Sequence, residues 1–201
     1  MFRLHYAPGT ISVAVAIALE RTGTAYAPVL VDFAQAAQTT ATYHQVNPKG
    51  RVPALETPQG ILTETGALLE FVAPDLVPTD PFAAARMREL MCYLNGTMHP
   101  NHAHGARGNR WADDPQSLAD MKRKVPQTMA ASCAYLDQML PDLPFGTGAF
   151  DVVSDAYLFV VLTWLNADGV DIATYPTLAA FQRQMDAHPA VKAVRAKGML
   201  A

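Results

Sequence analysis

The chain has 201 residues, fifteen of them basic and eighteen acidic, for a formal net charge of −3. This length is enough for one large domain or two small ones, and the lack of a dense basic run argues against a nucleic-acid partner. No apolar stretch reaches the roughly 18 residues of a membrane span, and residues 1–5 are typical of a strand and not of a signal peptide. We therefore expect a cytoplasmic protein without nucleic-acid or membrane partners.

The first half of the chain alternates strand and helix patterns. Residues 2–6 alternate as a strand, the apolar run 12–21 before Thr22-Gly23 predicts a helix, and residues 29–32 predict a second strand parallel to the first. A polar segment at 33–44 is expected to be an irregular loop with a short helix. A hairpin of strands 54–57 and 60–62 and a helix over 64–72 are predicted to follow. This β-α-β-α-β-β-α order is that of a thioredoxin-like domain.

The Pro-rich run at 74–81 marks a change in the pattern. Three prolines in eight residues cannot lie inside one regular element, so we expect a linker there. Helical periodicity then continues over 82–99, 115–140, 152–166 and 178–187, and Pro126 is expected to kink the second of these helices. The sequence thus predicts an α+β protein of two domains, a thioredoxin-like domain at 1–73 and an all-α domain at 82–201.

The two cysteines, Cys92 and Cys133, have no CxxC spacing. Both lie in helical segments among apolar residues, which is typical of structural thiols. We therefore expect both to be buried.

The strongest functional signal lies in the stretch 47–55 and in Thr63-Glu64-Thr65 after it. Pro53 precedes an apolar strand, and a proline is tolerated there only at the strand's first residue or on an edge. A cis Val52–Pro53 bond would turn the N–H and C=O of Val52 outward, free to pair with an extended ligand. Thr63 is predicted to cap a helix whose first turn, with unpaired amides, would bind a carboxylate. Together these features predict a site for a small peptide.

These residues resemble the glutathione transferase superfamily, in which a Val-Pro strand start holds the cysteinyl backbone of glutathione and a Glu-Ser or Glu-Thr pair holds its γ-glutamyl end. Residues 6–9, Tyr-Ala-Pro-Gly, and residues 155–159, Asp-Ala-Tyr-Leu-Phe, are similar to the bacterial beta-type members. The resemblance covers nearly the whole chain. It implies a homodimer that uses glutathione as co-substrate and needs no metal. The implied glutathione-binding residues are Arg51, Val52, Pro53, Glu64 and Thr65.

The glutathione thiol has to be activated, because a thiol with a pKa of about 8.5 is only slightly ionised at neutral pH. Aligning Tyr-Ala-Pro-Gly puts Ile11 where beta-type members usually carry a cysteine. Ile11 can neither form a mixed disulfide nor donate a hydrogen bond, so the hydroxyls of Ser12 and Thr10 become the candidate donors. We rank Ser12 slightly higher and Tyr6 third. The alternatives are that the two hydroxyls serve as helix caps and that Tyr6 is a buried core residue.

A group of histidines forms a second cluster. In beta-type relatives a histidine at the position of His99 projects toward the glutathione sulfur, and its pKa near 6.5 suits a hydrogen bond to the thiol. The lysine that often follows is Pro100 here. His102 is expected to share the face of His99. A metal hypothesis for His99, His102 and His104 lacks a carboxylate or thiol at ligand spacing.

Two arginines and a tryptophan follow the histidines. Arg107, Arg110 and Trp111 are predicted to line the pocket of an electrophile, and a solvated helix end explains them about equally well.

Asp155 resembles the acidic residue of the family's helix-capping motif, but Val152 stands where the motif has a hydroxyl. Asp151 or Ser154 could cap the helix with a shifted start. We expect this segment to affect folding and not chemistry.

The leading hypothesis is an enzyme that conjugates the glutathione thiolate to small apolar electrophiles in a cleft between the two domains. One alternative keeps glutathione but reduces disulfides or peroxides. Another is a catalytically silent binding protein with the same fold. Turnover with mixed disulfides would identify the reductase. Binding of glutathione without turnover would identify the silent binding protein.

Overall fold

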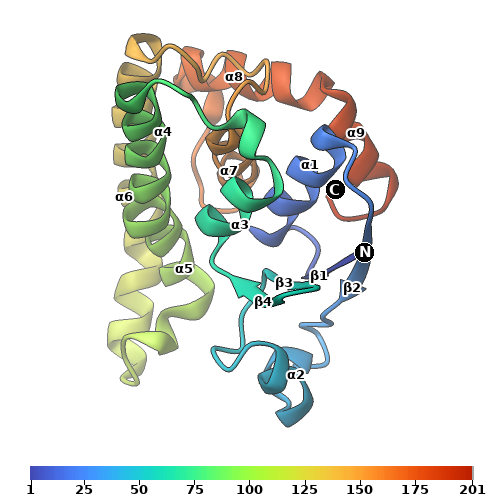
Figure 1. Ribbon diagram of the computed structural model, residues 1–201. Coiled ribbons are helices and arrows are strands. Elements are labelled where there is room, and N and C mark those ends of the chain that lie inside the picture. Colours follow the sequence, from blue (N-terminus) through green and yellow to red (C-terminus); the bar gives the residue numbers. More distant parts are fainter. Residues whose placement is uncertain (201) are drawn as a thin grey trace.

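The computed structural model describes residues 1–200 and joins a four-stranded sheet to a helical half (Figure 1). The sheet has the order β2-β1-β3-β4. In it, β1 (Phe2–Tyr6) runs parallel to β2 (Tyr26–Leu30) and antiparallel to β3 (Ala54–Thr57), and β4 (Gly60–Thr63) forms a hairpin with β3. The predicted thioredoxin-like topology, followed by helices, is confirmed.

Three helices flank the sheet. The helix α1 (Ser12–Thr22) connects β1 to β2 and ends at Gly23, whose φ of 67° fits the predicted stop. On the face of the sheet toward the helical half, α1 packs against α3 (Thr65–Val72), whereas the short α2 (Ala41–Val46) lies beyond the opposite face (Figure 1).

The second strand begins earlier than the sequence pattern predicts. Pro28 lies in the middle of β2, opposite Leu4 of β1. A proline removes one donor from a strand, but β2 is an edge strand that pairs only with β1, so this position is tolerated. Asp32, which we expected to end the strand, instead accepts a hydrogen bond from the Ala34 N–H at 2.9 Å and starts the next turn.

The helical half begins with α4 (Pro81–Tyr93), which continues through a π-helical turn (Leu94–Met98) into α5 (His99–Arg107). The prediction of one helix over 82–99 therefore ended too early, because it left out α5. The remaining helices are α6 (Pro115–Met139), α7 (Val153–Leu162), α8 (Pro176–Ala187) and α9 (Pro189–Ala196). Pro126 lies inside α6, which continues through it as one helix. The sequence pattern missed α9, a short helix that packs against α1.

The core is shared by the two halves. Every residue of α7 is buried, and α7 packs against α1 and α3 of the sheet half as well as against α4 and α8. A single apolar cluster therefore runs from Leu4 in β1 through Ile17 in α1 to Phe159 in α7. None of the helices within residues 1–200 is both long enough and apolar enough to cross a membrane.

The prediction of two buried cysteines is wrong for one of them. Cys133 is buried on α6, but Cys92 is exposed on α4. The buried stripe of α4 includes Met87, Leu90 and Met91, and the helical period places Cys92 outside it.

Candidate functional site

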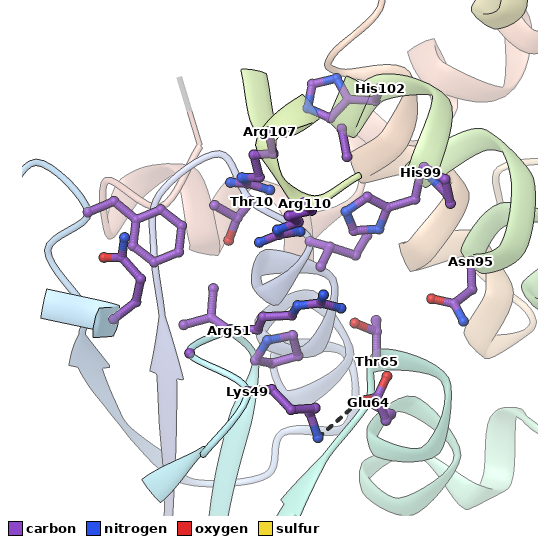
Figure 2. A pocket seen from close by; sticks show the side chains of 18 of the residues that line it. Thr10, Lys49, Arg51, Glu64, Thr65, Asn95, His99, His102, Arg107 and Arg110 are labelled. Carbon is purple, nitrogen blue, oxygen red and sulfur yellow. Dashed lines mark ion pairs between the residues drawn. The ribbon is translucent and has the colours of Figure 1, made fainter. Parts of the chain in front are cut away.

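A cavity of about 240 Å³ lies between the sheet half and α5 (Figure 2). Its lining comes from the residues just before α1, the segments after β2 and before β3, the start of α3, the helical segment 95–111, and α7 with the turn after it. Most of the predicted site residues meet here, but Ser12 and Tyr6 do not. The predicted residues in the lining are Thr10, Arg51, Val52, Pro53, Glu64, Thr65, His99, His102, Arg107 and Trp111.

One wall of the cavity presents free backbone groups. The Val52–Pro53 bond is cis, and within residues 1–200 neither the N–H nor the C=O of Val52 is hydrogen-bonded. The loop before them is fixed, because the Arg51 carbonyl accepts bonds from Tyr43 Oη at 2.9 Å and from Asn47 Nδ2 at 2.7 Å. An unpaired donor and acceptor on a fixed backbone suit an extended peptide.

The start of α3 differs in detail from the prediction. Thr63 belongs to β4 and accepts a hydrogen bond from Lys49 Nζ at 2.8 Å, so it is not the helix cap. Glu64 occupies the cap position with a φ of 71°, an uncommon conformation for a residue with a side chain, and pairs with Lys49 at 3.1 Å. Thr65 is then the first helical residue, and it lines the cavity. The amides of the first turn have no partner inside the helix, which makes this point suitable for a carboxylate.

Gly50 is required by the loop that carries Lys49 and Arg51. Its φ is 62°, and an added Cβ would lie 2.9 Å from the backbone oxygen of Gln38. We expect Gly50→Ala to lower the free energy of unfolding by about 1–3 kcal/mol, measured by urea denaturation. The control is Gly96→Ala, where an added Cβ meets open space and the backbone is not left-handed. Equal urea midpoints for the two variants would contradict this expectation.

The two candidate hydroxyls occupy different environments. Ser12 is completely buried and accepts a hydrogen bond from the Ala7 N–H at 3.1 Å. Thr10 lines the cavity, and its Oγ1 lies 2.7 Å from Ser12 Oγ and 2.8 Å from the Ala7 carbonyl. Thr10 therefore lies in the cavity wall and Ser12 lies behind it, so the geometry favours Thr10 as the donor, whereas the sequence ranked Ser12 slightly higher. Tyr6 is partly buried against the core and does not line the cavity.

His99 lies in the cavity wall as a neutral ring (Figure 2). Burial, with His102 and the nearby arginines, lowers the pKa of His99 to about 4, so the expectation of a value near 6.5 is wrong. Tyr157 Oη donates to Asn95 Oδ1 at 3.3 Å and therefore accepts from His99 Nδ1 at 3.2 Å. The proton of the neutral ring is then on Nδ1, and Nε2 is an acceptor.

The protonation of His99 can be measured directly. In NMR titrations we expect its ring C–H signals to shift with a midpoint near pH 4 instead of the ordinary value of about 6.5. The spectrum of His99→Gln identifies the signals. A midpoint near the ordinary value would show that the ring is charged in mildly acidic solution.

His102 belongs to a cluster that the sequence did not indicate. Its Nδ1 lies 2.9 Å from both carboxylate oxygens of Asp168, which is buried, and its ring stacks on Trp164 at 4.2 Å. The indole Nε1 of Trp164 donates to the Gly9 carbonyl at 2.8 Å. This cluster fixes the orientation of His102 and connects it to the loop that carries Thr10.

The end of α5 contributes positive charge and aromatic surface. Arg107 lies over the Phe33 ring at 5.7 Å, and Arg110 also lines the cavity. Trp111 lines the cavity and is 51% exposed. The centre of its ring lies 4.5 Å from the centre of the His104 ring. His104 is outside the lining, and within residues 1–200 no three His, Cys, Asp or Glu side chains are grouped as a metal site.

Known proteins are similar to this chain in sequence and in fold. The family model "Glutathione S-transferase, N-terminal domain" matches residues 2–74. Glutathione S-transferase GstA of Escherichia coli O157:H7 is 30% identical, with 98% of this chain and 99% of that protein covered. This chain belongs to the glutathione S-transferase family. A glutathione transferase homologue from Sulfitobacter, solved with bound glutathione, is 50% identical over 100% of this transferase and 99% of that chain, with a TM-score of 0.94. A beta-class transferase from Sphingomonas chungbukensis is 31% identical over 98% of this chain and 99% of that chain, with a TM-score of 0.82.

Sequence analysis missed several side chains at the cavity of this transferase, four of which make contacts described above. Asn95, Tyr157 and Trp164 line the cavity, and Asp168 lies behind His102. Tyr157 falls within the segment 155–159, for which the sequence predicts a role in folding and not in chemistry. The other three gave no local signal, because their partners are distant in the sequence.

Proposed function

We propose that this glutathione transferase conjugates the thiolate of glutathione to small electrophiles in the cavity between residues 1–73 and residues 82–201. The single observation that carries the proposal is the shared lining: free peptide groups at Val52, an anion site at Thr65 and a hydroxyl at Thr10 all face one cavity. Glutathione has a peptide backbone that suits Val52, carboxylates that suit Thr65 and a thiol that suits Thr10.

The proposed binding mode follows from these groups. The γ-glutamyl carboxylate binds the first turn of α3 at Thr65, and the ammonium group of the same residue binds Glu64. The cysteinyl N–H and C=O pair with Val52. Arg51, next to Val52 on the rim, binds the glycyl carboxylate. This arrangement directs the thiol toward the start of α1, where Thr10 and His99 line the cavity.

In the reaction, the thiol loses its proton and the sulfur attacks the electrophile. Thr10 donates a hydrogen bond to the thiolate. His99 Nε2, as an acceptor, binds the thiol before ionisation, but with a pKa of about 4 it does not hold the proton, which passes to solvent. Ile11 lines the cavity at the position that the resemblance assigns to a cysteine, and of the described residues neither cysteine lines it. Reduction of disulfides through a cysteine of the cavity is therefore not favoured.

Glutathione binding and turnover test the proposal. We expect calorimetry to detect glutathione binding and the neutral electrophile chlorodinitrobenzene to be conjugated. Glu64→Gln and Thr65→Val should each raise the KM for glutathione about tenfold, the effect of one lost charge-assisted bond. Asp142→Asn, an exposed charge change elsewhere, serves as the control. Binding without turnover would support the silent binding protein, and no binding would refute the proposal.

The proposal extends to assembly and location. A homodimer is supported by exposed apolar side chains such as Phe71 and Phe82, 44% and 74% exposed, which would be covered by a partner. A cytoplasmic location fits the use of reduced glutathione. Gel filtration with light scattering would test the dimer.

A further inference from the structure

Three guanidinium groups converge on the cavity. Arg51 comes from the loop before β3, and Arg107 and Arg110 come from the end of α5 and the turn after it (Figure 2). They reach the cavity from its opposite walls. The same space is therefore bordered by positive charge on the sheet side and on the helical side.

These arginines have no acidic partner. None of the ion pairs within residues 1–200 includes Arg51, Arg107 or Arg110, whereas Lys49 on the same rim is paired with Glu64. Burial and the charge of Arg51 lower the pKa of Arg107, and burial with both other arginines lowers that of Arg110. Like charges held together without a counter-ion are costly, which indicates that an anionic ligand compensates them.

Glutathione does not account for all of this charge. Its thiolate form has two carboxylates, one thiolate and one ammonium group, a net charge of about −2 by ordinary pKa values. With the Lys49–Glu64 pair neutral, the three arginines give the cavity a formal charge of +3. One positive charge remains after glutathione is bound. The proposed binding mode assigns Arg51 to glutathione, so the excess lies at Arg107 and Arg110.

The same two arginines border an aromatic surface. Arg107 lies over the Phe33 ring at 5.7 Å, and the Trp111 ring follows directly after Arg110 in the chain and lines the cavity. A flat apolar group can pack on Phe33 and Trp111 while an attached anion reaches the guanidinium groups. Planar guanidinium groups bind carboxylates with two parallel hydrogen bonds, which gives the site its geometric preference.

We propose that the electrophile of this enzyme has a flat apolar body bearing a carboxylate, which Arg107 and Arg110 bind. This inference rests on the proposed function and changes the predicted substrate class from purely apolar to amphipathic. For an aryl chloride, the glutathione sulfur forms a bond to the ring carbon, chloride leaves with the bonding electron pair, and the thiol proton goes to solvent. The carboxylate takes no part in bond making.

The test compares an acid with its ester. The substrates are chlorodinitrobenzoate and its methyl ester, and each kcat/KM is divided by the uncatalysed rate of the same compound with glutathione. We expect the acid to be preferred about tenfold or more, and Arg107→Gln and Arg110→Gln each to reduce the preference about tenfold. Lys192→Gln, which removes an exposed positive charge on α9 outside the cavity, should leave it unchanged.

Binding of an inert pair tests the inference even without turnover. Dinitrobenzoate and its methyl ester lack the leaving group, and their affinities can be measured by calorimetry in the presence of S-methylglutathione. The inference is supported if the wild type binds the acid more tightly than the ester and Arg110→Gln binds the two equally. Equal binding of acid and ester would overturn it. If the arginine variants weaken the binding of glutathione and leave the preference for the acid intact, all three arginines bind glutathione. That result would also overturn the inference.

Discussion

Thr10→Val is expected to raise the pKa of the bound glutathione thiol by about one to two units and to lower kcat/KM about tenfold to a hundredfold. Valine has nearly the same shape as threonine but has no hydroxyl. The variant therefore removes the proposed hydrogen bond to the charged sulfur, together with the bonds of the hydroxyl to Ala7 and Ser12, and leaves the packing nearly unchanged. The pKa is measured from the ultraviolet absorbance of the thiolate, by difference titration of the complex.

The local network explains how Thr10 can donate. In the structure its hydroxyl is bonded to the Ala7 carbonyl, with Ser12 Oγ 2.7 Å away. Ser12 Oγ is also 3.3 Å from the Ala7 carbonyl and can donate there instead. That exchange releases the hydroxyl proton of Thr10 toward the sulfur while Ala7 keeps a donor. Ser12 is thus a positioning residue in this mechanism.

Two further variants make the result specific. Thr10→Ser retains the hydroxyl and should retain most of the pKa shift. Ser12→Ala removes the alternative donor to Ala7 and should raise the thiol pKa by a smaller amount than Thr10→Val. An unchanged thiol pKa in Thr10→Val, with glutathione still bound, would show that another group activates the sulfur.

Asp155→Asn is expected to make the stability of the protein rise with pH between about pH 4 and pH 6.5. Asp155 is fully buried at the start of α7, where one oxygen accepts from the Asp151 N–H at 3.2 Å and the other has no partner. Burial raises the pKa of this carboxyl to about 7. The folded protein therefore holds a proton that the unfolded chain releases at its ordinary value of about 3.9, so Asp155 costs stability as pH rises from 4 to 7.

His99 acts in the opposite direction. Its pKa falls to about 4 in the folded protein, so the unfolded chain binds the extra proton and stability rises with pH up to about 6.5. In the wild type the two effects largely offset each other across this range. Without Asp155 the contribution of His99 remains, and the free energy of unfolding should increase by roughly 3 kcal/mol between about pH 4 and pH 6.5.

Urea denaturation at a series of pH values measures this difference. Relative to the wild type, Asp155→Asn should gain roughly 4 kcal/mol as pH rises from about 4 to 7. Asp142→Asn changes an exposed carboxylate elsewhere in the chain and should follow the wild-type curve. Parallel curves for wild type and Asp155→Asn would mean that Asp155 is ionised in the folded protein at all these pH values.

What the sequence predicted well was encoded in neighbouring residues. The cis Val52–Pro53 bond and the helix start at Thr65 depend on backbone geometry that a proline and a short polar run determine locally. Thr63 was misassigned because β4 extends one residue further than its pattern, and Glu64 takes the cap position without a side-chain cap. At the start of α7, neither Asp151 nor Ser154 caps the helix, and Val152 occupies that position.

What the sequence could not predict depends on distant contacts. Asp168 meets His102 across 66 residues, and Trp164 meets Gly9 across 155. The sequence ranked Ser12 above Thr10 for a related reason, because only the fold of the chain before α1 decides which hydroxyl lines the cavity. The lowered pKa of His99 likewise arises from burial and from charges on three separate segments.

Gly9 shows how the last residues of the chain take part in the site. Its N–H donates to the Met199 carbonyl at 2.9 Å, and its C=O accepts from Trp164, so the peptide groups on both sides of Gly9 are held by the helical half. A chimera that exchanged residues 1–73 between two transferases would lose both anchors unless positions equivalent to Trp164 and Met199 moved with them.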